Sequence, residues 1–543
     1  MNTIAAGWRD DNGRSLLKEA RSLPVIALVA LLVVWCCADW RSPPYSPDSW
    51  AYYELSKSIW RGGYRLSELR SYAYPAAAPS GAFPPLWPAL WSLVAALTGL
   101  GARAGLLGSF ACIATMAVFT EAIGRQLSGL RWVGLSAVAG LFAMPGFAEE
   151  VEAARSMPLQ MALTSALIWT LLRRGPITPL RASAMGFLCG ALVMARFDML
   201  AFSVVFGVSV LVLTRSFAAA AAFGLLFVAA VSPWTTVSWL WFRELLHSDS
   251  SFVASAIDPA TFVNDWYPPA HHRLTVSDDP IAWASKVAGN VPPMLESAAE
   301  SPGPGGLIVL FAALAALVLR RRDVTVLISS FATADASVRR FAAAAPAVAA
   351  PLLLCVVVGY FDSRYFSLGF WYVLMVLLTL ATFAWFRAAD PRLAESRTVL
   401  LALGALAIAA VANVPRALAR PAEPDFPELR EFATIENCLS RLGARPGDRV
   451  LFEDDTLAAR WAAVRGLPSA MLPRNMRRPG LTFDEKSHFI AQQGIRFAVG
   501  APDALDPIMR PLMQARASPC AVAVYRLAPT EAVHAGSPAT RVP

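Results

Sequence analysis

The stretch Cys36–Leu66, "CCADWRSPPYSPDSWAYYELSKSIWRGGYRL", is where a long apolar run of the chain gives way to polar sequence. Ser46 and Pro47 predict the cap and the first residue of a helix, because serine caps helix N-termini and proline suits the first turn. Asp48 then falls in that first turn, where the helix dipole favours a negative charge. The stretch therefore predicts a chain that leaves a bilayer and at once begins an aromatic helix with a carboxylate near its start.

The composition supports a bilayer span before this stretch. The 543 residues are 56% hydrophobic and only 16% charged, and the mean hydropathy is +0.48. Apolar runs of roughly 15–25 residues recur, which is the length of a bilayer-spanning helix. The runs are Leu23–Trp40, Pro85–Gly101, Ala104–Ile123, Trp132–Phe147, Pro158–Leu172, Ala182–Ala195, Met199–Thr214, Phe217–Phe242, Gly305–Leu319, Phe341–Tyr360, Phe366–Phe386 and Thr398–Asn413.

The net charge of +8 does not indicate a nucleic-acid partner. Basic residues cluster between the apolar runs, as they do in the cytoplasmic loops of membrane proteins. If Pro85–Gly101 lies in the interface, then the N-terminus, Arg125 and the triplet Arg320–Arg322 all face the cytoplasm. If Pro85–Gly101 instead crosses the membrane, the triplet Arg320–Arg322 lies on the outer side. The arginine bias therefore predicts a cytoplasmic N-terminus and about eleven spans plus interfacial helices.

The chain divides by composition into four parts. They are a cytoplasmic N-terminus (1–22), a mainly α, polytopic transmembrane helical bundle (23–414, with outer loops 41–103 and 243–304), a small outer α/β domain (415–528) and a disordered tail (529–543). Strand-like "RVLFED", "IRFAVG" and "CAVAVYRL" and helical "PELREFATIENCLSRLG" predict the α/β domain. Cys438 and Cys520 lie within it, and a disulfide and two unpaired thiols fit the sequence equally well.

This topology brings three features to the outer face. They are the Asp48 loop, the acidic turn "AEEVEAARSM" (Ala148–Met157) and the turn "YFDSRYF" (Tyr360–Phe366). Each also has a purely structural interpretation. A first-turn aspartate can serve only to stabilise its helix, glutamates can form a solvated turn, and an isolated outer arginine can extend to lipid headgroups.

Together with a later "PPLWP" (Pro84–Pro88), these features resemble the GT-C superfamily of integral-membrane glycosyltransferases. The nearest branch contains aminoarabinose transferase and the protein O-mannosyltransferases. The C-terminal "PGDRVL" and "GIRFAV" look like the periplasmic domain of bacterial members. The resemblance covers nearly the whole chain, and its motifs are short.

The resemblance implies transfer of a sugar from a polyprenyl-phosphate donor to a glycan, glycolipid or protein acceptor. It also implies a bacterial inner-membrane location, with the C-terminal domain in the periplasm. Asp48 matches the first-loop aspartate that acts as, or positions, the general base, and such a single displacement inverts the anomeric centre. Because the leaving group is a phosphate, the reaction needs cations more than a general acid.

Arg364 matches the "RYF" turn and is the candidate for the lipid phosphate, with Tyr365 beside it and Arg196 in "MARFDML" as the second cation. The resemblance also implies a second catalytic carboxylate in the acidic turn, which helps to orient the acceptor or, in some branches, holds a metal, and Glu150 is the candidate for it. Glu149 and Glu152 are not distinguished from it by the sequence, and some relatives carry aspartate there.

No residue is assigned as a metal ligand, although some branches of the superfamily use a divalent metal, which therefore stays open here. His271 and His272 near Asp278 and Asp279 lack a tight ligand spacing, so a mobile lid is the preferred interpretation of that loop. The chain has no Walker loop and no dinucleotide fingerprint, which argues against a nucleotide-sugar donor.

The alternative function is a transporter or lipid flippase. Carriers of polar substrates usually place charges or broken helices near the midplane. Here the runs hold almost no charge, and a soluble outer domain of about a hundred residues follows them, which favours the enzyme. An inactive relative acting as a scaffold also stays open.

Overall fold

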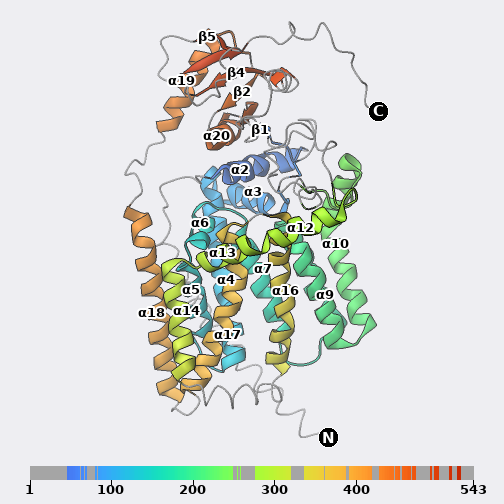
Figure 1. Ribbon diagram of the computed structural model, residues 1–543, viewed down its shortest axis with the longest axis vertical. Helices are drawn as coiled ribbons and strands as arrows, with labels where there is room; N and C mark the ends of the chain where they lie inside the picture. Colours follow the sequence, from blue (N-terminus) through green and yellow to red (C-terminus); the bar gives the residue numbers. More distant parts are fainter. Residues whose placement is uncertain are drawn as a thin grey trace. The chain divides into compact units, whose positions relative to one another are not determined.

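The computed structural model describes most of the chain between residues 46 and 527 (Figure 1). It leaves out 1–45, 70–79, 249–253, 258–274, 320–335, 387–390, 419–426, 472–489, 501–512, 517–522 and 528–543, with a few shorter gaps. The run Leu23–Trp40, His271 and His272, Cys520 and the predicted tail therefore lie outside the described residues. The chain forms two compact units.

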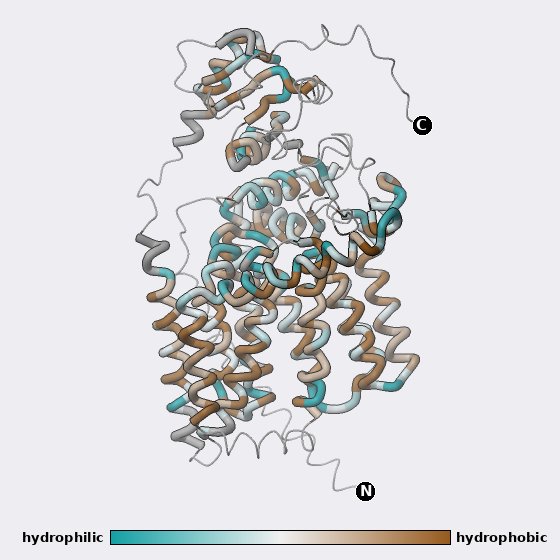
Figure 2. The backbone as a smooth tube through the Cα atoms, in the orientation of Figure 1, coloured by the Kyte–Doolittle hydropathy of each residue, from teal (hydrophilic) through white to brown (hydrophobic). Residues whose placement is uncertain are grey.

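The first unit is a bundle of apolar helices, and the chain is a multi-pass membrane protein. Figure 2 shows apolar residues along most of the length of these helices. Five described helices are long and apolar enough to cross a membrane, and a bent pair, Pro280–Glu300 with Gly303–Leu319, adds one more. The helices are α4 (Ala104–Ser128), α5 (Val133–Phe142), α7 (Met157–Leu172), α8 (Pro179–Ala195), α9 (Met199–Thr214), α10 (Phe217–Phe242), α14 (Gly303–Leu319), α16 (Ala336–Val358), α17 (Ser367–Phe386) and α18 (Pro391–Leu418).

Helices α4 and α5 approach one another very closely. A Cβ atom on Gly134 would lie 2.1 Å from the carbonyl oxygen of Thr120, so glycine is required there. The carboxylate of Glu121 accepts hydrogen bonds from the backbone N–H groups of Trp132, at 2.6 Å, and Leu135, at 3.1 Å. Glu121 thus satisfies donors at the N-terminus of α5, which helical hydrogen bonds leave unpaired.

Short elements at one end of this bundle carry the candidate site. They are α6 (Pro145–Glu152), α13 (Val291–Glu300) and the 3₁₀ turn η5 (Ser363–Phe366). Helix α6 contacts α4, α5, α7 and η5, and α13 contacts η5 and α16. The amide of Asn290 donates to the Val356 carbonyl at 2.8 Å, which ties the start of α13 to α16.

The second unit contains a six-stranded sheet of order β1-β3-β2-β4-β6-β5. Strands β1, β3, β2 and β4 are parallel, and β6 and β5 run antiparallel. The strands are β1 (Glu68–Leu69), β2 (Arg449–Phe452), β3 (Ser469–Met471), β4 (Ile495–Val499), β5 (Met513–Arg516) and β6 (Val524–Leu527), with helices α19 (Pro427–Arg441) and α20 (Asp455–Arg465).

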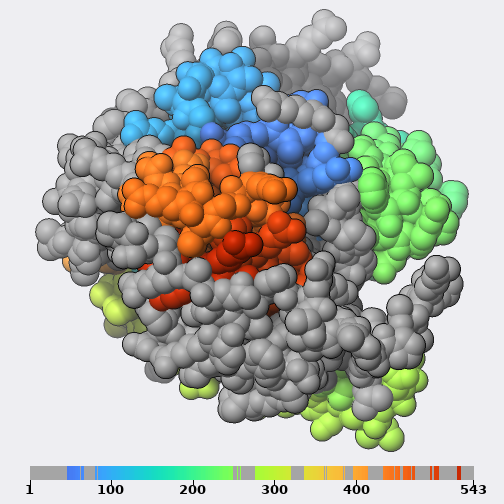
Figure 3. Space-filling model, turned by 90° about the horizontal axis from the view of Figure 1, so that it is seen from above, coloured from blue at the N-terminus to red at the C-terminus, as the bar shows by residue number. Residues whose placement is uncertain are grey.

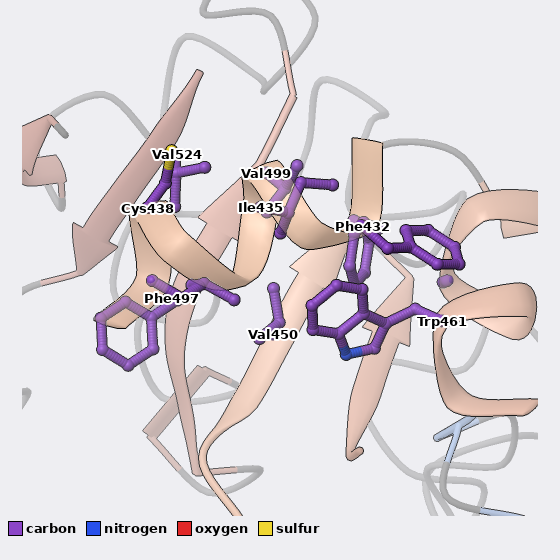
Figure 4. Packing of buried hydrophobic residues seen from close by; sticks show 11 residues of the cluster. Phe432, Ile435, Cys438, Val450, Trp461, Phe497, Val499 and Val524 are labelled. Carbon is purple, nitrogen blue, oxygen red and sulfur yellow. The ribbon is translucent and has the colours of Figure 1, made fainter. Parts of the chain in front are cut away.

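The predicted strands in "RVLFED" and "IRFAVG" are confirmed as β2 and β4, and the predicted helix as α19. The described strand in "CAVAVYRL" begins only at Val524. Trp461 is fully buried in the hydrophobic core, with its ring centroid 5.3 Å from that of Phe432 and 5.5 Å from that of Phe452 (Figure 4). Cys438 in this core is disulfide-bonded. Cys520, with which the sequence would pair it, is outside the described residues.

Strand β1 comes from the predicted first outer loop, although the rest of the sheet comes from the C-terminal part of the chain. Glu68 pairs with Ser469 and Leu69 with Ala470. The second unit also contains α2 (Pro47–Ser58) and the beginning of α3 (Leu86–Thr98). Helix α3 has only 13 residues. At about 1.5 Å per residue it is too short to span a hydrocarbon core of about 30 Å.

Candidate active site

Asp48 lies in the first turn of α2, as the sequence predicts. Ser46 is the N-cap, and its side-chain oxygen accepts a hydrogen bond from the backbone N–H of Ser49 at 3.1 Å. Pro47 occupies the first helical position. Asp48 is half-buried. The local sequence alone therefore fixes where the helix begins and places the carboxylate beside its positive end.

Aromatic side chains pack α2 against α3. The Tyr52 ring lies 4.6 Å from that of Phe83, and the Tyr53 ring 6.0 Å from that of Trp91. Trp91 in turn contacts Trp87, which belongs to the "PPLWP" motif, at 6.1 Å. The motif thus begins the helix that supports α2, through aromatic contacts that add to the burial of apolar area.

Glu150 is buried in the first unit, with 1% of its surface exposed. Its Oε1 atom lies 2.6 Å from Arg155 Nη1 and 3.4 Å from Arg364 Nη1. The side chain of Glu149 is 54% exposed and reaches Arg155 at 3.7 Å. Glu150 therefore joins the acidic turn to the "RYF" turn through its contacts with Arg155 and Arg364.

Arg364 is held by its own turn as well. Asp362 caps η5 by accepting from the Arg364 backbone N–H at 3.1 Å, and its carboxylate lies 3.3 Å from Arg364 Nε. The guanidinium lies 5.3 Å from the centre of the Tyr365 ring. A planar cation over an aromatic face gains further electrostatic stabilisation.

Arg196 reaches the same ring from the end of α8. Its guanidinium lies 5.0 Å from the Tyr365 ring centre. Asp198 accepts from both Arg196 Nε and Nη2, at 3.1 Å each. Tyr365 therefore contacts both predicted phosphate-binding arginines, and the structure brings Arg196, Tyr365, Arg364 and Glu150 into one cluster.

Three members of this cluster were not assigned a role from the sequence. Arg155 follows the acidic turn, and its contact with Glu150 depends on how α6 ends. Asp198 and Asp362 each stand two residues from the arginine they pair with, in "RFD" and "DSR". This i, i+2 spacing is a signal present in the sequence, because in extended or turn backbone it allows such pairs to meet.

Each arginine of the cluster lies in a close pair with a carboxylate among the described residues. Arg155, Arg196 and Arg364 are matched by Glu150, Asp198 and Asp362. The Oε2 atom of Glu150 is buried and has no hydrogen-bond partner within the described part of the chain. Partly buried arginines kept paired in this way offer fixed N–H donors of the geometry that binds carboxylates and phosphates.

Asp48 belongs to the second unit and the arginine cluster to the first. The structure defines the surroundings of each within its own unit. Asp278 and Asp279, proposed above as parts of a lid, act as caps. Asp278 accepts from the Thr275 backbone N–H at 2.7 Å, and Asp279 from that of Ala282 at 2.9 Å, at the start of α12 (Pro280–Gly289).

Within the described residues, no group of three or more His, Cys, Asp or Glu side chains could hold a metal ion. The hydrogen bonds from Thr275 lower the pKa of Asp278, which keeps this exposed capping carboxylate ionised. Capping of the local backbone is therefore sufficient to explain the presence of Asp278 and Asp279.

No protein-family model and no curated protein sequence matches the chain. The fold, however, is similar to solved structures. ArnT from Cupriavidus metallidurans bound to undecaprenyl phosphate superposes with a TM-score of 0.55 and 12% identity, over 95% of this chain and 99% of that chain. The apo form of the same protein superposes with a TM-score of 0.54 and 13% identity, over 97% of this chain and 99% of that chain.

A second protein has the same fold over a smaller share of its length. The oligosaccharyltransferase from Archaeoglobus fulgidus, in complex with Zn and sulfate, gives a TM-score of 0.50 and 12% identity, over 87% of this chain and 67% of that chain. Identity this low establishes fold and nothing finer. The predicted fold, a polytopic helical bundle with a small C-terminal α/β domain, is confirmed.

Proposed function

We propose that this protein is a membrane glycosyltransferase that moves a sugar from a polyprenyl-phosphate donor to an acceptor outside the cytoplasm. The fold it shares with ArnT bound to undecaprenyl phosphate, over nearly the full length of both chains, supports this class. The observation that carries the proposal is the cluster of the partly buried Arg155, Arg196 and Arg364 around Tyr365 and the buried Glu150. In this proposal the membrane is a bacterial inner membrane and the C-terminal domain is periplasmic.

In this proposal Arg364 and Arg196 bind the phosphate of the donor lipid, with the hydroxyl of Tyr365 as a further donor. A guanidinium has five N–H groups in a planar fork, so it can keep one carboxylate and still bind a phosphate. The contacts with Asp362 and Asp198 then serve to fix the direction of each guanidinium before the donor arrives. Such preorganisation lowers the cost of binding a charged group.

Glu150 and Arg155 have a positioning role toward Arg364. Because Glu150 Oε1 is shared between both arginines, a phosphate that approaches Arg364 competes with this carboxylate. Arg155 Nη1 lies 2.6 Å from Glu150 Oε1, so Arg155 keeps its ion pair with Glu150 when Arg364 binds the phosphate. The pair thus keeps a buried negative charge compensated in both states, which avoids the cost of an unpaired buried ion.

Asp48 is the proposed general base. It removes the proton from the acceptor hydroxyl or amine while the acceptor atom bonds to the anomeric carbon. The bond from that carbon to the phosphate oxygen breaks, and its electron pair leaves with the polyprenyl phosphate. Attack from the face opposite the phosphate inverts the anomeric configuration. The arginines stabilise the charge that develops on the departing phosphate.

The test is a transfer assay with the purified full-length protein in lipid nanodiscs. A panel of undecaprenyl-phosphate sugars is supplied with glycolipid, glycan and peptide acceptors, and release of undecaprenyl phosphate is followed by mass spectrometry. We expect release coupled to glycosylation of one acceptor class, with the opposite anomeric configuration. Movement of the donor lipid between leaflets without release of its phosphate would instead indicate the transporter or flippase.

A further inference from the structure

We propose that the C-terminal domain positions the helix that carries Asp48, through contacts between α20 and α2 made by Arg460, Trp50 and Lys57. The inference rests on the proposed function of Asp48 as the base. The C-terminal domain is then a part of the catalytic apparatus. A domain that served only as an appended binding module would not need to hold α2. Arg460 and Trp50 are positioning residues in this account.

The contact between these two helices is buried. Arg460 is 6% exposed, and its guanidinium lies 5.0 Å from the centre of the Trp50 ring, which is itself 2% exposed. An arginine over the face of tryptophan is the strongest common cation–π pair, and burial strengthens it. Figure 3 shows the blue atoms of the α2 segment bordering the orange atoms of the C-terminal elements.

A second anchor lies further along the same helices. The ammonium of Lys57 donates a hydrogen bond to the backbone carbonyl of Ala463. Trp50 and Lys57 are seven residues apart, close to two helical turns, so they lie on one face of α2. Their partners on α20, Arg460 and Ala463, lie about one helical turn apart. Two anchors on one face restrict both rotation and tilt of α2.

The loop that follows α2 is attached to the same domain. Strand β1 pairs in parallel with β3, so the chain is bound to the C-terminal sheet after α2 as well as along it. A strand of two residues is too short to form alone. Its place in the sheet therefore depends on the domain, and α2 is held between this strand and the α20 contact.

Helix α20 is buried on two sides. Trp461, next to Arg460, is fully buried in the domain core against Phe432 and Phe452 (Figure 4). A helix that is buried on more than one face has more than one packing partner. One face of α20 is therefore fixed in the core of the sheet domain, and an adjacent face holds α2.

The position of Asp48 depends on this contact. Side chains extend about 5 Å from a helix axis, so a rotation of about 10° would move a carboxylate on α2 by about 1 Å. A misplacement of that size in a catalytic group costs on the order of 10²-fold in rate. The two anchors resist such a rotation, because Trp50 is only two residues from Asp48.

The test compares Arg460→Ala with Arg460→Lys in the transfer assay. We expect Arg460→Ala to lower kcat on the order of 10²-fold with the donor KM unchanged, because the arginine cluster is untouched. Arg460→Lys keeps a cation near the ring and should restore kcat to within about tenfold of the wild type. The matched control is Arg465→Ala, on the same helix, which loses only a contact with Glu436 of α19 at 3.3 Å and should keep kcat within about twofold.

Trp50→Leu gives a second variant that keeps an apolar group in place. Trp50→Leu should lower kcat by a factor similar to that of Arg460→Ala. The double variant should have a kcat no lower than that of either single variant, because the two residues act as a unit. Hydrogen exchange adds a readout independent of activity. We expect exchange of the α2 amides to rise at least tenfold in Arg460→Ala while that of the α4 amides stays unchanged.

Two results would overturn the inference: wild-type kcat in Arg460→Ala, or multiplicative losses in the double variant with unchanged exchange in α2. Failure of the underlying function is distinguishable, since it would appear as full activity of Asp48→Asn. An inactive Asp48→Asn with a fully active Arg460→Ala would leave the base in place and remove only the positioning role.

Discussion

Glu150 has its carboxylate inside the protein and shares one oxygen between Arg155 and Arg364, at 2.6 and 3.4 Å. A buried ion of this kind is stable only while its partners are in place. The sequence could not choose it over Glu149 and Glu152, because three glutamates in one short turn look alike. The choice depends on the phase of α6, which begins at Pro145 and turns Glu150 inward.

Replacing Glu150 with glutamine removes the charge that compensates the two arginines. We expect the free energy of unfolding to fall by about 3 kcal/mol, the size typical of breaking a buried pair, and the donor KM to rise. Glu149→Gln is the matched control, since its side chain is 54% exposed, and it should change stability by less than about 0.5 kcal/mol. Equal effects of the two variants would show that Glu150 has no special position.

Arg364→Ala is expected to raise the donor KM about tenfold or more, as the loss of a charge-assisted hydrogen bond to phosphate would. Arg364→Lys should recover only part of this loss, because an ammonium cannot bind in the bidentate geometry of a guanidinium. The measurement is steady-state kinetics against donor concentration. An unchanged KM in Arg364→Ala would leave this residue a purely structural role.

Asp48→Asn removes the proposed base without changing the size of the side chain. We expect kcat to fall by a factor on the order of 10²–10⁴, the usual contribution of a general base, with membrane insertion intact. Asp278→Asn is the control, because this exposed carboxylate caps a turn at Thr275, its hydrogen-bond partner among the described residues. A fully active Asp48→Asn would remove Asp48 from the mechanism.

At the scale of elements, the sequence predicted best where the signals are local. The start of α2 follows from Ser46 and Pro47, and β2, β4 and α19 follow from their own periodicity. Strand β1 escaped prediction because its two residues acquire their conformation from β3, about 400 positions later in the chain. The sequence predicted Arg196, Tyr365 and Arg364 as members of one site. It missed Arg155, Asp198 and Asp362, because these ion pairs form only once the turns at the ends of α6, α8 and η5 have folded.

The close approach of α4 and α5 makes a prediction for stability. Gly134→Ala would place a Cβ atom 2.1 Å from the Thr120 carbonyl oxygen, so the helices must separate and the Glu121 cap must break. We expect a loss of about 2–4 kcal/mol and little folded protein in the membrane. Gly224→Ala is the control in α10, where nothing lies within 4 Å of the added atom. Normal yield and thermal stability of Gly134→Ala would contradict the close packing.

At the scale of the whole molecule, the distribution of arginines predicts the orientation of the chain in the membrane. A tag inserted after Arg322 should be protected from an impermeant reagent in intact cells, because arginine-rich loops stay in the cytoplasm. A tag after Ser277, in the long loop that precedes α12, should react. Reaction of the first tag with protection of the second would reverse the topology, and with it the side on which the proposed reaction occurs.

The most direct measurement of the central proposal is a cryo-EM structure of the full chain with undecaprenyl phosphate bound. The account predicts a phosphate oxygen within about 3 Å of the Arg364 guanidinium, near Tyr365 and Arg196, with the Asp48 carboxylate lining the same cavity. A phosphate bound away from these arginines, or an Asp48 that no cavity connects to it, would contradict the account.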